Sequence, residues 1–336
     1  MMSMVWNNSD PFQALALTGG GYRGLFTAKA LAVMEAETGA PLGRCFDLVC
    51  GTSIGGIVAL ALAFEIPMQK VVTVFEAHGL EIFPPHRRAP SGFLSQMIDF
   101  TRHSHKARYE AASLREVIAK LIPEKAILGD ALHAVAIPAV NLSEGKPQVF
   151  KTRHIESWNR DWKLNAIDIA MATSAAPTFF ELADIKGQLY ADGGLFANAP
   201  DLIALHEAEH FFSVPPEAFR LLSIGTTTKK YSVSYKKGRD FGVLDWMEGQ
   251  RLFSVIISAQ QQFVDQIVSH RLGERYLRVD SEPSNEQASD LGLDIASEEA
   301  KKALLALAEK TVTDILGTAL VPYLSHKSRM KIHREQ

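Results

Sequence analysis

The stretch CGTSIGG, residues 50–56, decides how this chain of 336 residues folds. Its Gly-x-Ser-x-Gly pattern is typical of a sharp turn between a strand and a helix, a turn that holds the serine hydroxyl outward. Residues 46–50 form a short apolar run that predicts a buried strand, and residues 54–64 predict a buried helix. Because strand, turn and helix follow in that order, Ser53 is a candidate nucleophile.

The alternation of strand and helix continues on both sides of this turn. Residues 12–17 predict a first strand and residues 24–38 a first helix, so the chain begins as a βαβ unit with a parallel sheet. Further strands are predicted at residues 131–140, 149–151, 188–191, 220–224 and 276–279, and further helices at residues 114–121, 165–172, 200–212, 245–270 and 297–316. The fold class is therefore α/β, with a central, mostly parallel sheet that is mixed at one edge and flanked by helices.

Composition bounds the class of protein. A hydrophobic content of 47% supports a large core, and a formal net charge of −3 gives no overall attraction to a nucleic-acid polymer. Residues 1–12 lack the basic and apolar regions of a secretory signal, and the longest apolar run is too short to span a membrane. We therefore expect a cytoplasmic protein. Its two cysteines, Cys45 and Cys50, are expected to be core residues rather than metal ligands.

A second glycine-rich stretch, TGGGYRG at residues 18–24, lies between the first strand and the first helix. It matches the Gly-x-Gly-x-x-Gly dinucleotide fingerprint, but the second strand ends in Cys50 and Gly51 where that fingerprint requires an acidic residue. Successive glycines at a helix amino terminus also aim amide N–H groups at one point, where negative charge is favoured. The stretch therefore predicts an oxyanion hole, with a dinucleotide site as the alternative.

A nucleophilic serine needs a base, and two kinds are available. The order Ser53, Asp192, then His206 or His210 matches the chain order of a Ser-His-Asp triad. Asp192 is better placed than either histidine, because it ends a predicted strand and is followed by two glycines that allow a close backbone approach. Partial burial raises the pKa of such a carboxylate toward the range of a general base.

Residues 79–108 form the longest irregular region of the prediction. They mix apolar residues with cations, which suits contact with a phospholipid surface or an anionic ligand. We expect this segment to gate the site. Its candidate phosphate-binding cations are Arg87, Arg88, Arg102, Lys106 and Arg108.

Three motifs in this order resemble the signatures of patatin-like phospholipases. They are GGGYRG at residues 19–24, GTSIGG at residues 51–56 and DGG at residues 192–194. Residues 172–177 and 198–200 extend the resemblance, which covers residues 12–226. It implies a catalytic domain over residues 12–226, with residues 227–336 as a carboxyl-terminal helical extension packed on the same domain.

The resemblance also implies the site. Ser53 and Asp192 form a catalytic dyad, Gly51 and Gly55 shape the elbow around the serine, and an oxyanion hole is made by Gly19, Gly20 and Gly21, with Arg23 beside it. No metal or cofactor is needed for this chemistry. Thr18 departs from the pattern, because many members of the family have aspartate at this position.

A narrower resemblance points to the substrate and to control. Residues 138–142, 149–152, 172–180 and 222–226 are similar to the bacterial patatin-like effectors of cyclic-oligonucleotide anti-phage signalling. That resemblance implies membrane phospholipid as substrate, at the inner face of the membrane, and a cyclic dinucleotide as activator. The oligomeric state stays open, a homo-oligomer included. Two other hypotheses remain: a Ser-His-Asp esterase that uses His206 or His210, and a non-catalytic dinucleotide-binding module.

Overall fold

The computed structural model describes residues 11–87, 106–227, 230–247 and 251–333. Within them eight strands form one sheet, in the order β5-β6-β3-β2-β1-β7-β8 with β4 also paired to β3. The strands are β1 (Phe12–Leu17), β2 (Leu48–Gly51), β3 (Val135–Asn141), β4 (Lys146–Lys151), β5 (Ala183–Ile185), β6 (Gln188–Asp192), β7 (Phe219–Ile224) and β8 (Tyr276–Val279). Strands β3, β2, β1, β7 and β8 are parallel, while β4, β5 and β6 pair antiparallel, so the predicted mixed edge is confirmed.

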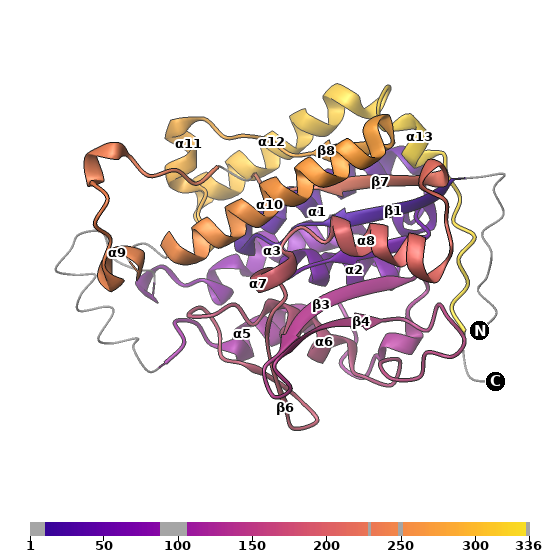
Figure 1. Cartoon of the computed structure of the whole chain (residues 1–336), viewed down its shortest axis with the longest axis horizontal. Coiled ribbons are helices and arrows are strands. Elements are labelled where there is room, and N and C mark those ends of the chain that lie inside the picture. Colours follow the sequence, from indigo (N-terminus) through magenta and orange to yellow (C-terminus); the bar gives the residue numbers. More distant parts are fainter. Residues whose placement is uncertain (1–10, 88–105, 228–229, 248–250, 334–336) are drawn as a thin grey trace.

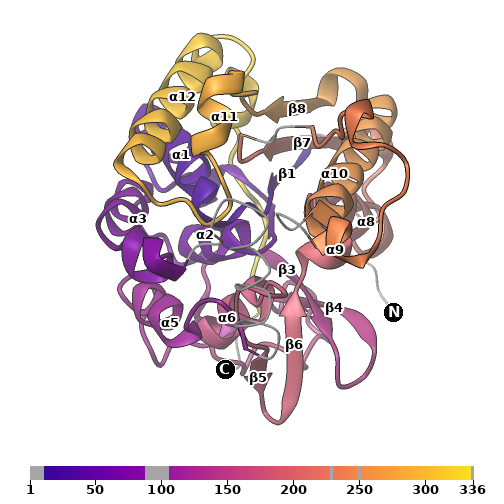
Figure 2. The same ribbon diagram turned by 90° about the vertical axis from the view of Figure 1, so that its left-hand side faces the viewer.

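Helices cover both faces of the sheet, which makes three layers (Figure 2). One face carries α1 (Gly24–Thr38), α2 (Ile54–Ala63), α3 (Met68–Ile82), α5 (Ala111–Ala119), α6 (Ala166–Ser174) and α12 (Glu298–Leu316). The other carries α8 (Asp201–His206) and α10 (Arg251–Leu272). Four short helices complete the described set: α7 (Gly194–Ala197), α9 (Val243–Met247), α11 (Asn285–Asp290) and α13 (Val321–Leu324). The three-layer α/β fold is therefore confirmed.

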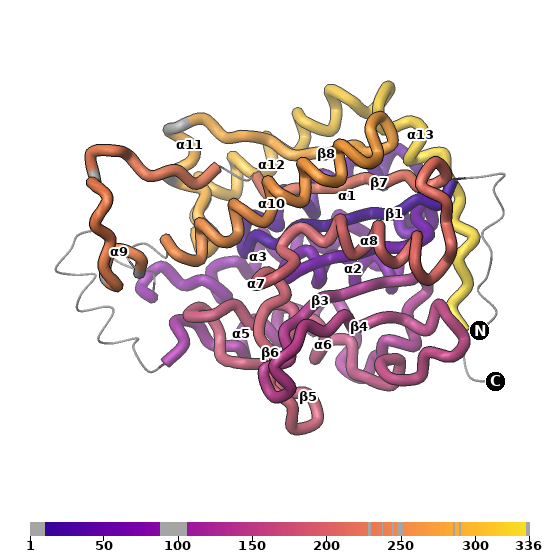
Figure 3. Tube along the Cα trace, viewed as in Figure 1, coloured from indigo at the N-terminus to yellow at the C-terminus, as the bar shows by residue number. Residues whose placement is uncertain are grey.

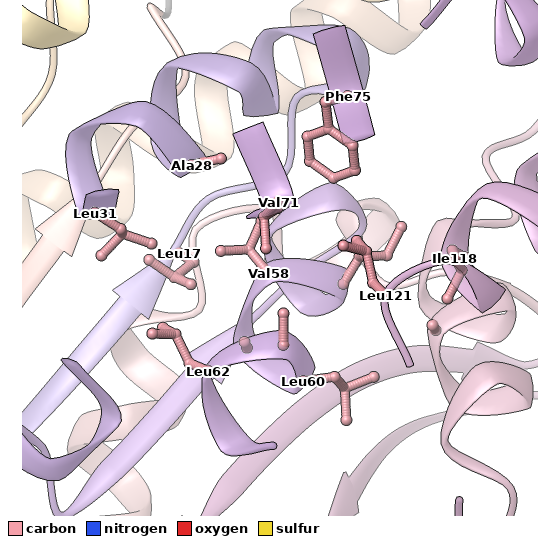
Figure 4. Close-up of a cluster of buried hydrophobic side chains, with 14 of the residues drawn as sticks. Leu17, Ala28, Leu31, Val58, Leu60, Leu62, Val71, Phe75, Ile118 and Leu121 are labelled. Carbon is pink, nitrogen blue, oxygen red and sulfur yellow. The ribbon is translucent and has the colours of Figure 1, made fainter. Parts of the chain in front are cut away.

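Burial of both faces explains why the sequence of the central strand β1 is a nearly continuous apolar run. Successive side chains of a strand point to opposite faces, and Leu15 and Leu17 enter one core while Ala14 and Ala16 enter the other. Figure 4 shows Leu17 in the first core among side chains of α1, α2, α3 and α5. Both faces of β1 are thus buried, as in a sheet covered by helices on both sides.

The predicted elements are found with shifted ends, and one region was wrong. Predicted helix 245–270 corresponds to α9 and α10, with residues 248–250 between them outside the described residues. The expected irregular region does not begin at Gly79, because Gly79 to Ile82 form the last turn of α3. That turn is helical because Val71, Phe75 and Ile82 recur at helical spacing and are buried.

The carboxyl-terminal part is more than a helical extension. Its strand β8 pairs with β7 in the sheet and its helix α12 packs against α1, so residues beyond 226 complete both the sheet and one helical layer. The last described stretch runs along the end of the molecule opposite α9 (Figure 3). There the buried Asp47 carboxylate accepts hydrogen bonds from His326 Nε2 and from the Arg329 amide, at 2.8 and 2.9 Å.

Candidate active site

Strand β3 brings the two halves of the site together. The amino-terminal half of β3 pairs with β2, and its carboxyl-terminal half pairs with β6, while β4 occupies the opposite edge. Because β2 is parallel and β6 antiparallel to β3, the carboxyl ends of β2 and β6 face each other along one edge. The interval between them contains Pro138, which has no N–H group to leave unpaired there. Ser53 follows β2 and Asp192 ends β6, so the sheet places both at this interval.

The turn at Ser53 has the strained geometry of a nucleophile elbow. Ser53 adopts φ 55° and ψ −126°, a backbone conformation that residues other than glycine rarely adopt. Its amide donates to Thr173 Oγ1 at 3.0 Å, which ties the turn to α6. The flanking glycines permit the tight path: a Cβ at Gly51 would lie 2.2 Å from the Gly55 carbonyl oxygen, and one at Gly55 would lie 2.3 Å from that of Leu17.

Asp192 is the hydrogen-bond partner of the serine. Ser53 Oγ donates to Asp192 Oδ2 at 2.7 Å, and the Gly194 amide donates to Asp192 Oδ1 at 2.6 Å. Burial raises the pKa of Asp192 to about 6, while the hydrogen bonds from Ser53 and Gly194 act in the opposite direction. A carboxylate with that pKa is ionised at neutral pH and basic enough to accept a proton from the serine.

The first glycine run lies against this pair, and its amides are not equivalent. The Gly19 amide donates to the Asn198 carbonyl at 2.9 Å and the Tyr22 amide donates to the Leu293 carbonyl at 2.8 Å. Within the part of the chain that the structure describes, the amides of Gly20 and Gly21 have no acceptor. The Gly19 amide is therefore already used, and we narrow the expected oxyanion donors to Gly20 and Gly21.

Arg23 lies next to this run but does not line the cavity beside Ser53. Its side chain donates from Nε to the Gly20 carbonyl at 3.4 Å, which supports the loop that carries the free amides. Burial lowers the pKa of the Arg23 guanidinium to about 10, against the opposing effect of the Asp280 carboxylate. Arg23 thus holds the glycine loop from outside rather than facing the serine.

Sequence reasoning missed the partly buried Arg278, which forms hydrogen bonds next to the glycine run. Arg278 Nη1 donates to Thr18 Oγ1 at 3.0 Å and to Ser223 Oγ at 2.7 Å, and its Nη2 donates to Asp280 Oδ2 at 3.0 Å. Thr18, the departure from the family pattern, is thus a hydrogen-bond acceptor for a guanidinium. Arg278 gave no signal in the sequence, because it lies 260 residues from Thr18.

An apolar cavity opens beside Ser53 and Asp192. Besides the glycine run, its polar lining residues are Tyr22, Ser53, Ser174, Asp192 and Asn198. The rest of the wall is largely aliphatic and aromatic, with side chains such as Phe75, Ile82, Phe83, Leu114, Phe180 and Phe253. A cavity with one reactive polar end and apolar walls fits an ester that carries a long hydrocarbon chain.

The two candidate histidines lie elsewhere. The rings of His206 and His210 stack on each other with centroids 5.0 Å apart, and His206 lines a different cavity, together with Phe211 and Gln148. Among the described residues, no histidine lines the cavity at Ser53. The structure therefore brings Asp192, and neither His206 nor His210, to the serine hydroxyl.

The cations of the expected gate are only partly described. Arg88 and Arg102 lie outside the described residues, and Lys106 is exposed. Arg87 Nη1 donates to the Arg108 carbonyl at 3.4 Å, and Arg108 Nη1 donates to the Arg87 carbonyl at 3.0 Å. These two arginines therefore hold the chain at residue 87 against the chain at residue 108.

None of the helices in the described ranges is long and apolar enough to cross a membrane.

A serine at a strained turn, hydrogen-bonded to a buried carboxylate beside an apolar cavity, is the arrangement of a serine hydrolase of lipid esters. The family model of patatin-like phospholipase matches residues 15–205. The chain belongs to this family and is a lipid acyl hydrolase.

Relatives match nearly the whole chain. A "cGAMP-activated phospholipase" from Pseudomonas aeruginosa is 38% identical over 94% of this chain and 93% of its own length. Another from Vibrio cholerae is 36% identical, with coverage of 89% and 90%. A "cUMP-AMP-activated phospholipase" from Escherichia coli is 25% identical over 66% of each chain. The sequence-based recognition of the family is thus confirmed.

Asp192→Asn is expected to stabilise the protein above pH 6. The raised pKa of Asp192 means that the native state binds its proton more tightly than the unfolded state does, so ionisation costs stability as pH rises from about 4 through about 6. A rise from 3.8 to about 6 corresponds to at most about 3 kcal/mol. Asparagine avoids this cost, because its oxygen can accept from Gly194 and its amide can face Ser53. Urea unfolding at pH 8 and pH 5 measures the gain, which should be smaller at pH 5.

A matched control is Asp47→Asn. Asp47 is also buried, but its carboxylate accepts hydrogen bonds from the amides of Gln13 and Arg329 and from His326. Both carboxylate oxygens of Asp47 accept from a backbone amide, so the side-chain NH₂ of asparagine would face the N–H of either Gln13 or Arg329. This variant is therefore expected to lose stability at both pH values. Destabilisation of Asp192→Asn at pH 8 would contradict the raised pKa.

His206→Ala and His210→Ala are each expected to keep kcat within about twofold of wild type, because neither imidazole contacts the serine. Hydrolysis of a soluble ester by each purified variant measures this. A loss of orders of magnitude in a well-folded variant would restore the Ser-His-Asp alternative.

Proposed function

We propose that this chain hydrolyses the acyl esters of membrane glycerophospholipids through a Ser53–Asp192 dyad. The observation that carries the proposal is the 2.7 Å hydrogen bond from Ser53 Oγ to the buried Asp192 carboxylate at the polar end of an apolar cavity. The cavity wall accounts for an acyl chain and the dyad for the ester bond. Membership of the patatin-like phospholipase family supports the same substrate class.

The reaction follows from these positions. Ser53 Oγ bonds to the ester carbonyl carbon as its proton passes to Asp192, and the resulting oxyanion accepts hydrogen bonds from the amides of Gly20 and Gly21. Protonated Asp192 then gives the proton to the departing alcohol, which leaves an acyl-serine. Water loses a proton to Asp192 and attacks the acyl carbon, and Ser53 regains its proton as the fatty acid leaves.

We also propose that a cyclic dinucleotide activates the enzyme, which would act from the cytoplasm on the inner face of the membrane. The names of the Pseudomonas and Vibrio relatives support this activation. Purified protein incubated with phospholipid vesicles, with and without a panel of cyclic dinucleotides, tests it by mass spectrometry of released fatty acid and lysophospholipid. We expect low release alone and strong release with one nucleotide. Full release without nucleotide would rule out activation.

The segment that ends at Arg108 remains our proposed gate. Because Arg87 and Arg108 already hold each other's backbone, alanine at those positions would loosen the segment as well as remove charge. The cleaner variant is therefore Arg88→Ala with Arg102→Ala and Lys106→Ala. It should lose stimulation by nucleotide while keeping hydrolysis of a small soluble ester. Stimulation that survives in this variant would move the nucleotide site elsewhere.

A further inference from the structure

Helix α10 and the described segment before it, residues 230–247, together expose eight large apolar side chains. On α10, Leu252, Ile256 and Phe263 recur at helical spacing, so they form one stripe along the helix. The segment before α10 adds Tyr231, Val233, Tyr235, Val243 and Trp246. Three of the eight are more than half exposed: Tyr235 at 91%, Val243 at 76% and Phe263 at 61%. We call these eight residues the apolar face.

The apolar face adjoins the cavity of the dyad through a single helix. On the other sides of α10, Phe253 and Ile257 line that cavity, and Val264 and Val268 pack into the core. α10 therefore carries the cavity wall on one side and the exposed stripe on another. α9 lies at the end of the molecule toward which β1 runs, the same end as the turn at Ser53 (Figure 1).

The charge around the apolar face is positive. In the described segment 230–247, the exposed charged side chains are three cations, Lys230, Lys236 and Arg239, and two carboxylates, Asp240 and Asp245. Lys230, Lys236 and Arg239 are exposed among the apolar side chains. Cations next to Tyr and Trp suit the headgroup level of an anionic bilayer, where aromatic rings bury their apolar part and lysines meet phosphate.

We propose that the apolar face docks on an anionic lipid bilayer and so holds the mouth of the cavity at the membrane. This inference rests on the proposed function, because only a hydrolase of membrane lipid needs its cavity there. The exposed cations favour an anionic bilayer over the same face of a second copy, which carries the same cations and repels them. Docking at this face would place the bilayer against α10, the helix whose Phe253 and Ile257 line the cavity of Ser53.

The test separates binding from catalysis. Binding is measured by sedimentation of the inactive Ser53→Ala protein with vesicles of phosphatidylcholine alone or mixed with phosphatidylglycerol, without nucleotide. We expect binding to the mixed vesicles, and a loss of about tenfold or more when Leu252, Ile256 and Phe263 become glutamine together, since each buries apolar area in the bilayer. The matched control replaces Leu132 and Leu142, each 47% exposed, by glutamine and should bind normally.

Charge-reversal variants give a second test of vesicle binding. Lys236→Glu with Arg239→Glu should weaken binding to the mixed vesicles. Binding to phosphatidylcholine vesicles, and its dependence on salt, should stay unchanged. With Ser53 restored, the glutamine variant should hydrolyse a soluble ester at the wild-type rate, because its three positions do not line the cavity.

Three results would overturn docking at this face. They are absent vesicle binding by the Ser53→Ala protein, unchanged binding by the glutamine variant, and light scattering in which that variant converts an oligomer into a monomer, which would assign the face to a second copy. Failure of the wild-type protein to cleave any ester would instead overturn the proposed function, and the vesicle result would stand apart from it.

Discussion

Ser53→Ala is expected to abolish lipid hydrolysis, with kcat lower by about 10⁴-fold or more, while the protein stays folded. The substitution removes the hydroxyl that donates to Asp192 Oδ2 and should leave the backbone of the turn unchanged. Asp192→Asn should cause a comparable loss, because an amide cannot take the proton from the serine. Since the two residues act as a unit, the double variant should be little worse than either single one. Release of fatty acid from vesicles measures all three.

The matched control for this series is Ser213→Ala. Ser213 also has a positive φ, 52°, but is not among the residues that line the cavity, so the same chemical change there should leave activity intact. Far-UV circular dichroism confirms folding of each variant. Substantial activity in Asp192→Asn would disprove the dyad and reopen the question of the base.

Gly20→Ala and Gly21→Ala are expected to lower kcat by about 10²-fold or more each, the usual effect of losing an oxyanion donor. A Cβ at Gly20 would lie 2.4 Å from Thr226 Oγ1. At Gly21 the backbone has φ +57°, and a Cβ would lie 2.1 Å from the Leu293 carbonyl oxygen. Either contact must shift the loop, which turns its free amides away from the oxyanion. Steady-state kinetics on a soluble ester measure kcat and KM separately.

Two other glycines control for the substitution itself. Gly39 has φ +62° with nothing near its Cβ position, so alanine there reports backbone strain alone. Gly317 has open space and no positive φ, so alanine there should be neutral. Wild-type kcat in both Gly20→Ala and Gly21→Ala would remove the oxyanion assignment, and a selective loss of NAD binding would favour the dinucleotide module.

Local motifs predicted the parts of the site that local geometry determines. The Gly-x-Ser-x-Gly turn predicted the elbow, and the glycines after Asp192 predicted a tight approach, which the structure shows as the Gly194 amide bonded to that carboxylate. The helix and strand periods likewise predicted the layers, because burial on both faces leaves a continuous apolar run.

Contacts between distant segments were outside the reach of such patterns. Thr173 accepts from the Ser53 amide across 120 residues, and the Asn198 carbonyl takes the Gly19 amide. Both lie in segments that carried the family resemblance, yet nothing local assigned them a partner. The error at Gly79 had another cause: residues 79–82 were assigned to the irregular region, while burial of the surrounding apolar side chains keeps α3 helical to Ile82.

The shared edge of β3 also constrains how this chain can change over evolution. The interval between Ala136, which pairs with β2, and Ala139, which pairs with β6, sets how far apart the two strand ends lie. One inserted or deleted residue there would displace one end by about 3.3 Å, more than a hydrogen bond tolerates, and would turn the following side chains to the opposite face. Descendants of this sequence can therefore lengthen or shorten their loops, whereas this short interval has to keep its length in every lineage that keeps the serine bonded to its carboxylate.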